Sequence, residues 1–213
     1  MGKCRAERRI KNLEIARSAI SANIEKLMRP AIFLDRDGVL SAAILRDGRP
    51  YAPTRIEDFE ILPDAGRDAK RLKDAGYLLV VATNQPDIAR GLVARATVDA
   101  MHDRLRTEIP LDDVYVCECI EGPDCPCYKP KPGMLLAAAK KWGIDLRHSY
   151  MVGDRWRDIG AGKAAGCRTI LIDRGYWGDR PAETPDMVVS SLSEACACIL
   201  DKKSAETVQS PGD

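Results

Sequence analysis

The sequence predicts an α/β fold in which a mostly parallel sheet forms the middle layer of a three-layer sandwich. Short runs of continuous apolar residues alternate along the chain with stretches of helical periodicity, which is typical of parallel strands that helices cover on both faces. With 213 residues, the chain has the length of one ordinary domain. We therefore expect a single hydrophobic core built around this sheet.

Each expected element is assigned from its local pattern. Strands are expected where apolar, β-branched residues run together, and helices where apolar residues recur every three to four positions. In chain order the elements are a strand at 31–34, a helix at 63–76, a strand at 77–84, a helix at 95–107, a strand at 114–117, a helix at 133–142, a strand at 149–154, a helix at 158–166, a strand at 169–173 and a helix at 192–200.

The two ends of the chain differ from the body. Residues 1–30 carry eight Lys/Arg against three Asp/Glu, and apolar residues recur at helical spacing from Arg5 to Met28. We expect a basic amphipathic extension that packs on the body or on a second subunit; a membrane-surface helix and a translation start at Met28 are the alternatives. Residues 31–200 form the expected domain, and the polar residues 201–213 form an expected flexible tail.

The overall charge excludes some classes of function. Lys and Arg total 33 against 32 Asp and Glu, so the net charge of +1 gives no general attraction to nucleic acid or to an anionic membrane. No segment approaches the roughly 18 apolar residues of a membrane span, and no signal-peptide pattern is present. A GxxxxGK[ST] phosphate loop is also missing, which argues against a kinase. We expect a cytoplasmic protein that acts as a monomer on a small molecule.

Polar side chains gather where the expected strands end. In open parallel sheets, ligands bind beyond the carboxyl ends of the strands, so these residues are the candidates for a site. The three strand ends carry Asp35-Arg36-Asp37-Gly38 after the strand at 31–34, Thr83-Asn84-Gln85 in the strand at 77–84 and beyond, and Asp154 in the strand at 149–154.

The residue types at these ends suit phosphoryl transfer. One carboxylate of the Asp35 and Asp37 pair can attack phosphorus, and the other can move a proton to the leaving group and from water. Asp154 would add a third oxygen ligand for Mg²⁺, and Thr83 offers a hydroxyl to phosphoryl oxygens. A lysine is needed to balance charge, and Lys129 and Lys131 are both candidates. A DxDG sequence by itself could equally be a surface turn.

Four of the eight cysteines are concentrated in one short loop. Cys117, Cys119, Cys125 and Cys127 form a C-x-C-x5-C-x-C pattern, whose thiolates can surround Zn²⁺ in a closed structural site. A disulfide pair or a redox site is the alternative. We expect Cys167, Cys196 and Cys198 to behave as small buried apolar residues. His102 and His148 lie away from these motifs in the sequence, and we expect surface or helix-end positions for both.

Four segments together resemble a known family. FLDRDGV, TNQPDIARG, CYKPKPGML and VGDRWRD, in this order, are similar to the four motifs of haloacid-dehalogenase-type phosphatases. They most resemble the branch that contains D-glycero-D-manno-heptose 1,7-bisphosphate 7-phosphatase and histidinol-phosphatase. The resemblance extends from Ala31 to about Leu200. It implies a Rossmann-like fold in which a short zinc loop stands in place of a large cap domain.

The resemblance also implies roles for individual residues. Asp35 is the expected nucleophile and Asp37 the general acid and base, while Thr83 and Lys129 hold the phosphoryl group. Catalytic Mg²⁺ is expected on Asp35, the backbone carbonyl of Asp37, and Asp154, and structural Zn²⁺ on the four cysteines of the loop. Asp158 would be an acid behind these groups or a helix cap. Substrate contacts are expected from Asn84, Gln85, Tyr128 and Arg155.

The expected reaction is Mg²⁺-dependent hydrolysis of a phosphomonoester through an aspartyl phosphate. The expected substrate is a heptose 1,7-bisphosphate, which would lose its 7-phosphate, or a related sugar phosphate. The alternatives are a phosphatase for histidinol phosphate and a non-catalytic zinc-loop binding module.

This sequence departs from the branch at Cys119, where a histidine is usual, and at Tyr128, where an arginine contacts substrate in heptose bisphosphatases. Lys131, Arg46, Arg49 or Arg155 could supply the missing charge. We expect the loop at 41–51 to cover the site. If the substrate is histidinol phosphate, its cationic amine could bind to the acidic residues Glu118, Glu121 and Asp124.

Overall fold

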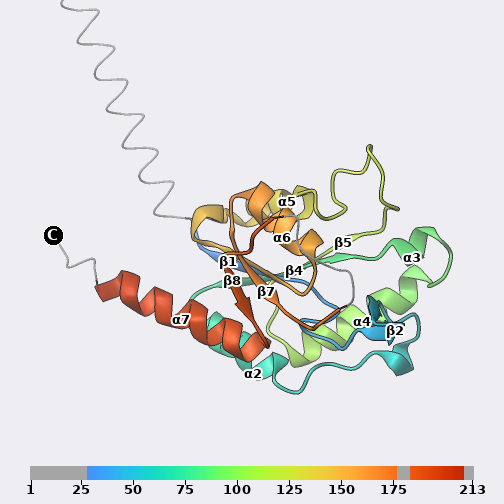
Figure 1. The fold of residues 1–213 in the computed structure, drawn as a ribbon, viewed down its shortest axis with the longest axis horizontal. Helices are drawn as coiled ribbons and strands as arrows, with labels where there is room; N and C mark the ends of the chain where they lie inside the picture. The colour runs from blue at the N-terminus through green and yellow to red at the C-terminus, as the bar shows by residue number, and fades with distance from the viewer. Residues whose placement is uncertain (1–27, 177–182, 209–213) are drawn as a thin grey trace, which may run out of the picture.

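The computed structural model describes residues 28–176 and 183–208. Its centre is a six-stranded sheet with the strand order β5-β4-β1-β6-β7-β8, in which every neighbouring pair is parallel (Figure 1). This arrangement confirms the predicted α/β fold. The amphipathic helix predicted from Arg5 to Met28 lies outside the described residues, apart from Met28 itself.

The strands of the sheet are short and mostly buried. Their bounds are β1 (Ala31–Leu34), β4 (Leu78–Asn84), β5 (Asp113–Cys117), β6 (Tyr150–Gly153), β7 (Arg168–Ile172) and β8 (Met187–Val189), and a separate antiparallel hairpin consists of β2 (Ile44–Arg46) and β3 (Arg49–Tyr51). The helices are α2 (Ala65–Asp74), α3 (Pro86–Ala89), α4 (Arg95–Glu108), α5 (Gly133–Trp142), α6 (Trp156–Ala165) and α7 (Leu192–Val208), with short 3₁₀ turns at Ile56–Asp58 and Leu146–His148.

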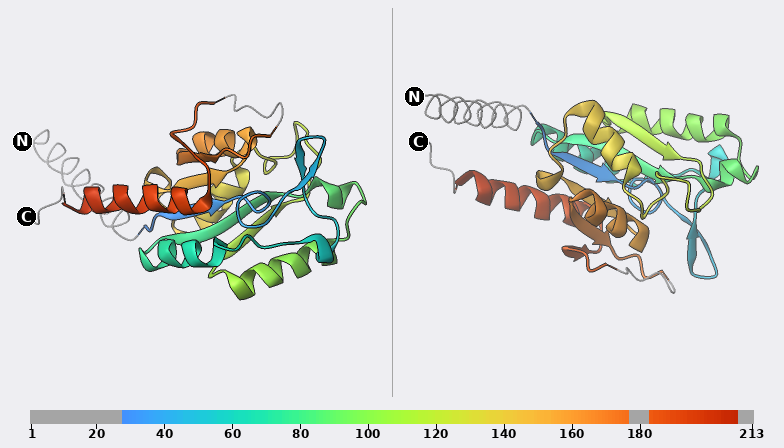
Figure 2. Two further views of the ribbon diagram at one scale, coloured as in Figure 1. Left: turned by 60° about the horizontal axis from the view of Figure 1, so that its bottom comes forward. Right: turned by 90° about the horizontal axis from the view of Figure 1, so that it is seen from above.

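Helices cover the sheet on both faces, and each face has its own core. In β1, Ile32 and Leu34 face the core shared with α2, α4 and α7, whereas Ala31 and Phe33 face the core shared with α5 and α6. This alternation follows from the two-residue repeat of a strand. Figure 2 shows the two helical layers on opposite sides of the sheet. A strand buried on both faces needs a continuous apolar sequence, which is why AIFL could be recognised as one.

The strand order creates a switch point at β1. The chain passes from β1 to β4 and β5 on one side, and then returns to β6, β7 and β8 on the other side. The loops that leave β1, β4 and β6 therefore diverge around one opening at the carboxyl edge of the sheet. In parallel sheets this opening is where ligands bind.

Three features differ from the sequence-based expectations. The segment at 41–51, expected to be a loop, contains the β2–β3 hairpin, which projects from the body (Figure 2). The short strand β8 and the one-turn helix α3 were not predicted. The helix α7 ends at Val208 instead of Leu200, so part of the expected flexible tail is helical. These three-residue strands and this polar helix end carry too little apolar periodicity to be recognised.

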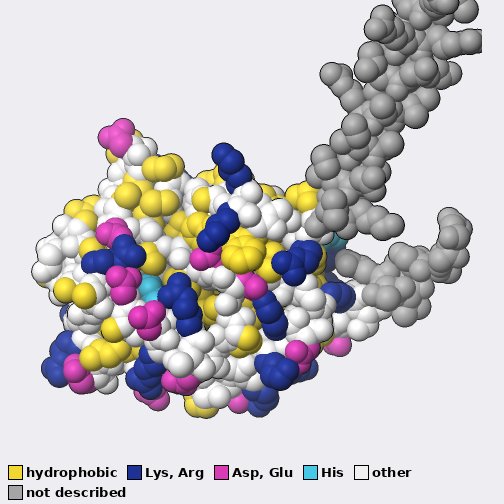
Figure 3. Space-filling model, turned by 180° about the vertical axis from the view of Figure 1, so that it is seen from behind, with side chains coloured by type: hydrophobic (Ala, Val, Ile, Leu, Met, Phe, Trp, Pro, Cys, Tyr) yellow, Lys and Arg dark blue, Asp and Glu magenta, His cyan; other side chains and the backbone are white. Residues whose placement is uncertain are grey.

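Charges of both signs are interspersed over the surface seen in Figure 3. Many of them pair along single helices, for example Lys70 with Asp74 and Arg95 with Asp99. Within the described parts of the chain, no helix has both the length and the apolar character that crossing a membrane would require.

Candidate active site

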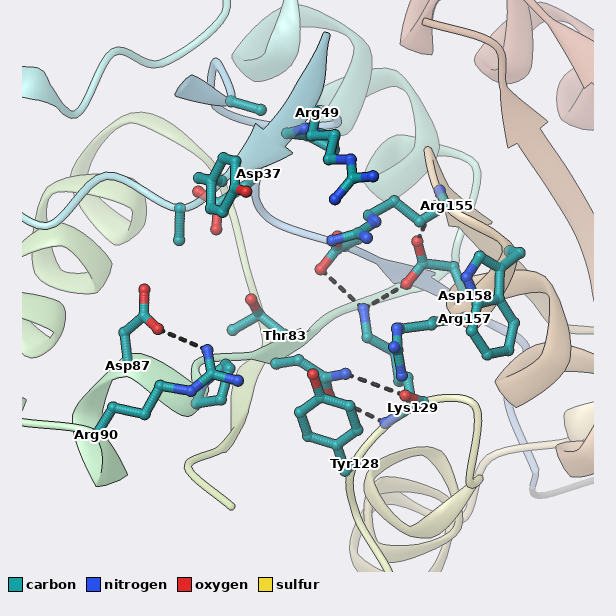
Figure 4. A pocket seen from close by; sticks show the side chains of 18 residues that line it. Asp37, Arg49, Thr83, Asp87, Arg90, Tyr128, Lys129, Arg155, Arg157 and Asp158 are labelled. Atoms are coloured by element: carbon teal, nitrogen blue, oxygen red, sulfur yellow. Dashed lines mark hydrogen bonds and ion pairs between the residues drawn. The ribbon is translucent and has the colours of Figure 1, made fainter. Parts of the chain in front are cut away.

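The carboxyl edge of the sheet brings the four sequence motifs together. Asp35 follows β1, Thr83 lies near the end of β4, Asp154 follows β6, and Lys129 lies in the segment between β5 and α5. Asp35, Thr83 and Lys129 line one cavity of about 610 Å³, together with residues of the β2–β3 hairpin and of α6 (Figure 4). Four segments that are far apart in the sequence thus contribute to one site.

Lys129 links two carboxylates at the base of this cavity. Its Nζ donates to Oδ1 of Asp35 at 2.8 Å and to Oδ1 of Asp158 in a close ion pair. Lys129 and Asp158 are only 2 % and 1 % exposed. Burial lowers the pKa of Lys129, but the carboxylates of Asp158 and Asp35 raise it by more. The ammonium group is therefore charged across the physiological pH range.

Asp158 has both functions that the sequence left open. Its Oδ2 accepts a hydrogen bond from the backbone N–H of Arg155 at 3.1 Å, which caps the first turn of α6. Its Oδ1 accepts a hydrogen bond from Nζ of Lys129. Burial raises the pKa of Asp158 to about 6, although Lys129 lowers it. The helix cap thus also orients the lysine toward Asp35.

Asp154 has the surroundings of a metal ligand. Both of its carboxylate oxygens are buried, and neither has a hydrogen-bond partner of ordinary geometry among the described residues. Burial and the carboxylates of Asp35 and Asp158 raise the pKa of Asp154 well above its usual value, while Tyr176 and Lys129 lower it by less. Oxygens of Asp35, Asp154 and Asp158 lie within 4.8 Å of one another. Clustered, unsatisfied carboxylates fit a small dication that prefers oxygen ligands.

Two glycines allow these carboxylates to approach the backbone. Gly38 has a φ of +88°, and a Cβ at this position would lie 1.7 Å from Oδ2 of Asp154. A Cβ at Gly153 would lie 2.1 Å from Cβ of Asp158. No side chain fits at either position without displacing an acid, so both glycines are requirements of the site.

Asp37 lies in a dense hydrogen-bond network. Arg36 binds it through Nε at 3.0 Å and Nη2 at 2.8 Å, Ser41 donates to Oδ1 at 3.1 Å, and Gln85 donates to Oδ2 at 3.0 Å. Arg36 is fully buried and its guanidinium lies 5.5 Å from the ring centre of Phe59. The second acid of the DxD pair is therefore held from behind by a buried arginine.

The expectation for His102 was wrong. His102 is 2 % exposed, and its Nε2 lies 3.2 Å from Nη1 of Arg36, directly behind Asp37. Burial and the nearby charge of Arg36 lower the pKa of His102 to about 3, so its imidazole is neutral. The contact joins positions 66 residues apart in the chain, which is why sequence patterns could not reveal it. The other histidine, His148, is exposed in the turn before β6, as expected.

The two residues at the end of β4, Asn84 and Gln85, differ in their roles. Asn84 lines the cavity, and its side-chain amide binds the backbone N–H and C=O of Lys129 at 3.0 and 3.2 Å. Gln85, expected to contact substrate, is instead 1 % exposed and donates to Asp37 and to Oγ1 of Thr83. Gln85 is thus placed to orient the reacting groups from below the surface of the cavity.

The four loop cysteines converge as a zinc site requires. Their sulfur atoms lie within 4.8 Å of one another, with distances of 3.5 Å from Cys117 to Cys125, 3.8 Å from Cys119 to Cys127 and 3.4 Å from Cys125 to Cys127. All four are free thiols. Burial raises the pKa of the Cys125 thiol, but hydrogen bonds from Cys119 and Cys127 lower it by more, to about 6. Four sulfurs that converge on one point fit a tetrahedral cation such as zinc, whose bonds to sulfur are about 2.3 Å long.

The cysteine loop is joined directly to the segment that carries Lys129. Lys131, one candidate for the site lysine, points away from the site: its Nζ donates to the backbone carbonyls of Gly122, Pro123 and Cys125 at 2.7, 2.8 and 2.8 Å. A Cβ at Gly133 would lie 2.2 Å from the carbonyl oxygen of Pro126, so α5 begins in close contact with the loop. A change in the conformation of the cysteine loop would therefore shift the position of Lys129.

Arginines from three elements line the rest of the cavity. They are Arg49 from the hairpin, Arg90 after α3, and Arg155 and Arg157 at the start of α6. Arg49 and Arg155 were among the expected sources of positive charge, whereas Arg46 stacks on Tyr51 at 5.4 Å. The sequence patterns indicate no role for Arg90 or Arg157. Tyr128 also lines the cavity, with the guanidinium of Arg157 at 5.3 Å from its ring centre.

Comparisons with known proteins agree with this geometry. A family model described as HAD-hydrolase-like matches residues 126–195. The D-glycero-D-manno-heptose-1,7-bisphosphate 7-phosphatase of Thermosynechococcus vestitus is 36 % identical over 190 residues, which cover 78 % of this chain and 93 % of the relative. The corresponding β-anomer phosphatase of Pseudomonas aeruginosa is 37 % identical over 154 residues, with coverages of 70 % and 84 %.

Solved structures are similar over most of the chain. The crystal structure of the D,D-heptose 1,7-bisphosphate phosphatase from B. bronchiseptica, complexed with magnesium and phosphate, has a TM-score of 0.69 at 30 % identity and covers 81 % of this chain and 99 % of its own. A putative HAD-like phosphatase from Mesorhizobium loti has a TM-score of 0.63 at 31 % identity, with coverages of 81 % and 86 %.

Proposed function

The chain belongs to the haloacid-dehalogenase-like phosphatase family that includes the D-glycero-D-manno-heptose 1,7-bisphosphate 7-phosphatases, and from this premise we propose that it removes the 7-phosphate of a heptose 1,7-bisphosphate or a closely related sugar phosphate. The carboxyl-edge cluster of Asp35, Lys129, Asp154 and Asp158 supports this proposal. The cavity of about 610 Å³ has room for a phosphorylated sugar.

In the proposed first step, Asp35 attacks the phosphorus of the 7-phosphate and forms an aspartyl phosphate, while the sugar oxygen leaves. Lys129 engages Oδ1 of Asp35 at 2.8 Å, and no donor among the described residues engages Oδ2, which leaves that oxygen for attack. The ion pair also holds the carboxylate in one orientation, and such positioning lowers the barrier of a displacement. The charge of Lys129 and the hydroxyl of Thr83 would stabilise the phosphoryl oxygens.

Asp37 is the proposed acid and base. In its acid form it would give a proton to the departing sugar oxygen, and as the resulting carboxylate it would take a proton from the water that attacks the aspartyl phosphate. The contacts from Arg36, Ser41 and Gln85 suit the carboxylate form, because all three groups donate hydrogen bonds to it. These donors would also fix the distance of Asp37 from the reacting atoms.

A magnesium ion fits the site beside Asp35. The proposed ligands are Asp35, Asp154 and the backbone carbonyl of Asp37. When bound, the ion would supply positive charge to the phosphoryl group and reduce its repulsion from the acids. The unsatisfied oxygens of Asp154 are the feature of this chain that supports the assignment. Zinc is the proposed occupant of the cysteine cluster, where it would hold the loop in place.

The sugar-phosphate assignment is favoured over histidinol phosphate by the surroundings of two loop acids. Glu118 forms a close ion pair with Arg95, and Glu121 pairs with Arg157 at 2.7 Å. Neither acid lines the cavity. Outside the reaction centre the lining has four arginines against one acid, Asp87, which pairs with Arg90 at 2.9 Å. A cationic amine would therefore meet positive charge, whereas an additional anionic group would be attracted.

The observation that carries the proposal is the buried contact of Lys129 with Asp35 at the switch point of the sheet. The test is Mg²⁺-dependent phosphate release from both heptose 1,7-bisphosphate anomers, histidinol phosphate and simple hexose phosphates. We expect the highest kcat/KM for one heptose anomer. A preference for histidinol phosphate would identify the chain as a histidinol-phosphatase instead. The absence of phosphate release from every compound would contradict the catalytic assignment.

A further inference from the structure

A second interaction runs beside the Lys129–Asp158 ion pair. Tyr128 precedes Lys129 in the chain, and Arg157 precedes Asp158. The guanidinium of Arg157 lies 5.3 Å from the ring centre of Tyr128, so the two neighbouring residues also meet. Consecutive Cα atoms are about 3.8 Å apart. Arg157 lines the same cavity as Asp35 and Lys129, so its charge faces the space that the substrate would occupy.

Arg157 is fixed in this position by several contacts. Its guanidinium also lies 4.7 Å from the ring of Trp156, and Nη1 donates to Oε1 of Glu121 at 2.7 Å. The side chain is only 20 % exposed. Arginine stacks well on aromatic faces, and a group that is already ordered loses little conformational entropy when it binds a ligand. Arg157 therefore has the preorganised character of a binding residue.

Most of the hydrogen-bonding capacity of Arg157 is unused. A guanidinium has five N–H donors in a plane, and within the described residues only Nη1 of Arg157 has an acceptor. Aromatic rings stacked on its face leave the in-plane donors accessible. A phosphate oxygen pair is a good partner for such donors, because it can accept two parallel hydrogen bonds.

The contact with Glu121 offers a simpler explanation, in which Arg157 only ties the cysteine loop to α6. The side chain of Glu121 is 54 % exposed, however. Ion pairs with such exposed carboxylates contribute little to stability, since water competes for both charges. The two explanations differ in a testable way. If Arg157 only ties the loop to α6, replacing Arg157 and replacing Glu121 have the same effect on substrate binding. If Arg157 binds substrate, only the replacement of Arg157 weakens substrate binding.

We propose that Arg157, stacked on Tyr128 and Trp156, forms a subsite for a second phosphate of the substrate. The inference rests on the proposed phosphatase function and narrows it, because it makes the preferred substrate a small molecule with two phosphates, one hydrolysed and one retained. It also relocates the expected positive charge. The arginine that the family resemblance led us to expect at position 128 is replaced by a tyrosine that supports an arginine from α6.

The test compares two ligands that differ only in the retained phosphate. D-glycero-D-manno-heptose 1,7-bisphosphate and the corresponding 7-phosphate are titrated by calorimetry into the full chain carrying Asp35→Asn, which prevents turnover. The same titrations are repeated with Arg157→Met, which keeps an apolar side chain of similar length for stacking, and with Glu121→Gln. Thermal unfolding of each variant confirms that it is folded.

We expect the parent to bind the bisphosphate more tightly than the monophosphate. Arg157→Met should weaken bisphosphate binding about tenfold or more, as loss of a charged hydrogen bond implies, and monophosphate binding less than about twofold. Glu121→Gln should leave bisphosphate binding unchanged or tighter, because it removes a competing acceptor.

Three results would overturn the subsite: equal binding of both ligands by the parent, equal losses for both ligands in Arg157→Met, or matching losses in Arg157→Met and Glu121→Gln. Hydrolysis of p-nitrophenyl phosphate by the chain with Asp35 intact separates this inference from the proposed function. If hydrolysis occurs while the subsite tests fail, the chain is a phosphatase without the Arg157 subsite. If hydrolysis is absent, the phosphatase assignment fails, and the titrations still decide whether Arg157 binds a second phosphate.

Discussion

At the scale of single residues, Gly38 connects backbone conformation to the acids of the site. Its φ of +88° and the position of Asp154 leave no space for a Cβ. We predict that Gly38→Ala displaces Asp154 and lowers kcat/KM by a factor on the order of 10², as expected when catalytic groups move by about 1 Å. Phosphate release at several Mg²⁺ concentrations measures the effect.

Gly143→Ala is the matched control for this prediction. Gly143 has a φ of +60°, but no atom lies within 4 Å of the position that its Cβ would take. This variant should lose about 1–2 kcal/mol of stability from the left-handed conformation alone and keep its activity. Full activity in Gly38→Ala would show that the close approach to Asp154 has no role in the reaction.

The neutral, buried His102 predicts a dependence of stability on pH. Its pKa of about 3 lies below the ordinary value of 6.5, so the unfolded chain binds more protons than the folded one between these two values. Its contribution to stability is complete above about pH 6.5 and decreases as the pH falls. At pH 5 the loss should be about 2 kcal/mol relative to pH 7.5.

Denaturant unfolding of His102→Gln at both pH values tests this prediction. Without the histidine, the decrease in stability between pH 7.5 and pH 5 should be smaller by about 2 kcal/mol. His148→Gln, which changes the exposed histidine, controls for the removal of an imidazole. Identical decreases in the parent and in His102→Gln would mean that burial of His102 does not lower its pKa.

At the scale of the elements, the cysteine loop is predicted to need its metal. The purified chain should contain about one zinc per molecule, and Cys125→Ser should remove it. The loop leads directly into the segment with Lys129, so losing the zinc should also destabilise the fold. We expect the Tm of Cys125→Ser to be lower than that of the parent by on the order of 5–10 °C, which corresponds to a loss of a few kcal/mol of stability in a chain of this size. Metal analysis and calorimetry measure both effects.

Cys198→Ser is the control for the loop cysteines, since Cys198 lies on α7 and outside the cluster. It should retain zinc and nearly the same Tm. Equal stability of the metal-free and metal-loaded chain would contradict a structural zinc site.

The elements also show what sequence patterns can predict. The strands β1 and β4 were predictable because buried parallel strands need continuous apolar residues, and the helix α5 because its apolar residues recur on one side. The β2–β3 hairpin was missed, since strands of three residues show no alternation. The end of α7 was missed because its polar residues lack an apolar stripe; the helix-forming Lys, Ala and Glu were the available signal.

At the scale of the whole molecule, the switch point at β1 explains why residues from four motifs meet. Asp35 and Asp154 were predictable candidates because parallel strands end at one edge. Contacts between distant segments were not predictable in this way. Arg157 reaches Tyr128 and His102 reaches Arg36 only because α6 and α4 pack beside the site, and no periodicity in the sequence encodes these pairings.

The proposed retention of one phosphate is also a property of the whole molecule, because the hairpin, Tyr128 and Lys129 after the cysteine loop, and α6 all contribute to one cavity. All of its chemistry depends on Asp35 at the centre. Replacement of a nucleophile commonly lowers the rate by a factor of 10³ or more, and the intermediate cannot form without it.

The most direct test of this account is mass spectrometry of peptides after rapid acid quench of the chain with Mg²⁺ and heptose 1,7-bisphosphate. We expect a phosphoryl group on Asp35, its absence in Asp35→Asn, and a fall in phosphate release of about 10³-fold or more in that variant. Phosphate release by Asp35→Asn at the parent rate, or a phosphoryl group on another residue, would contradict it.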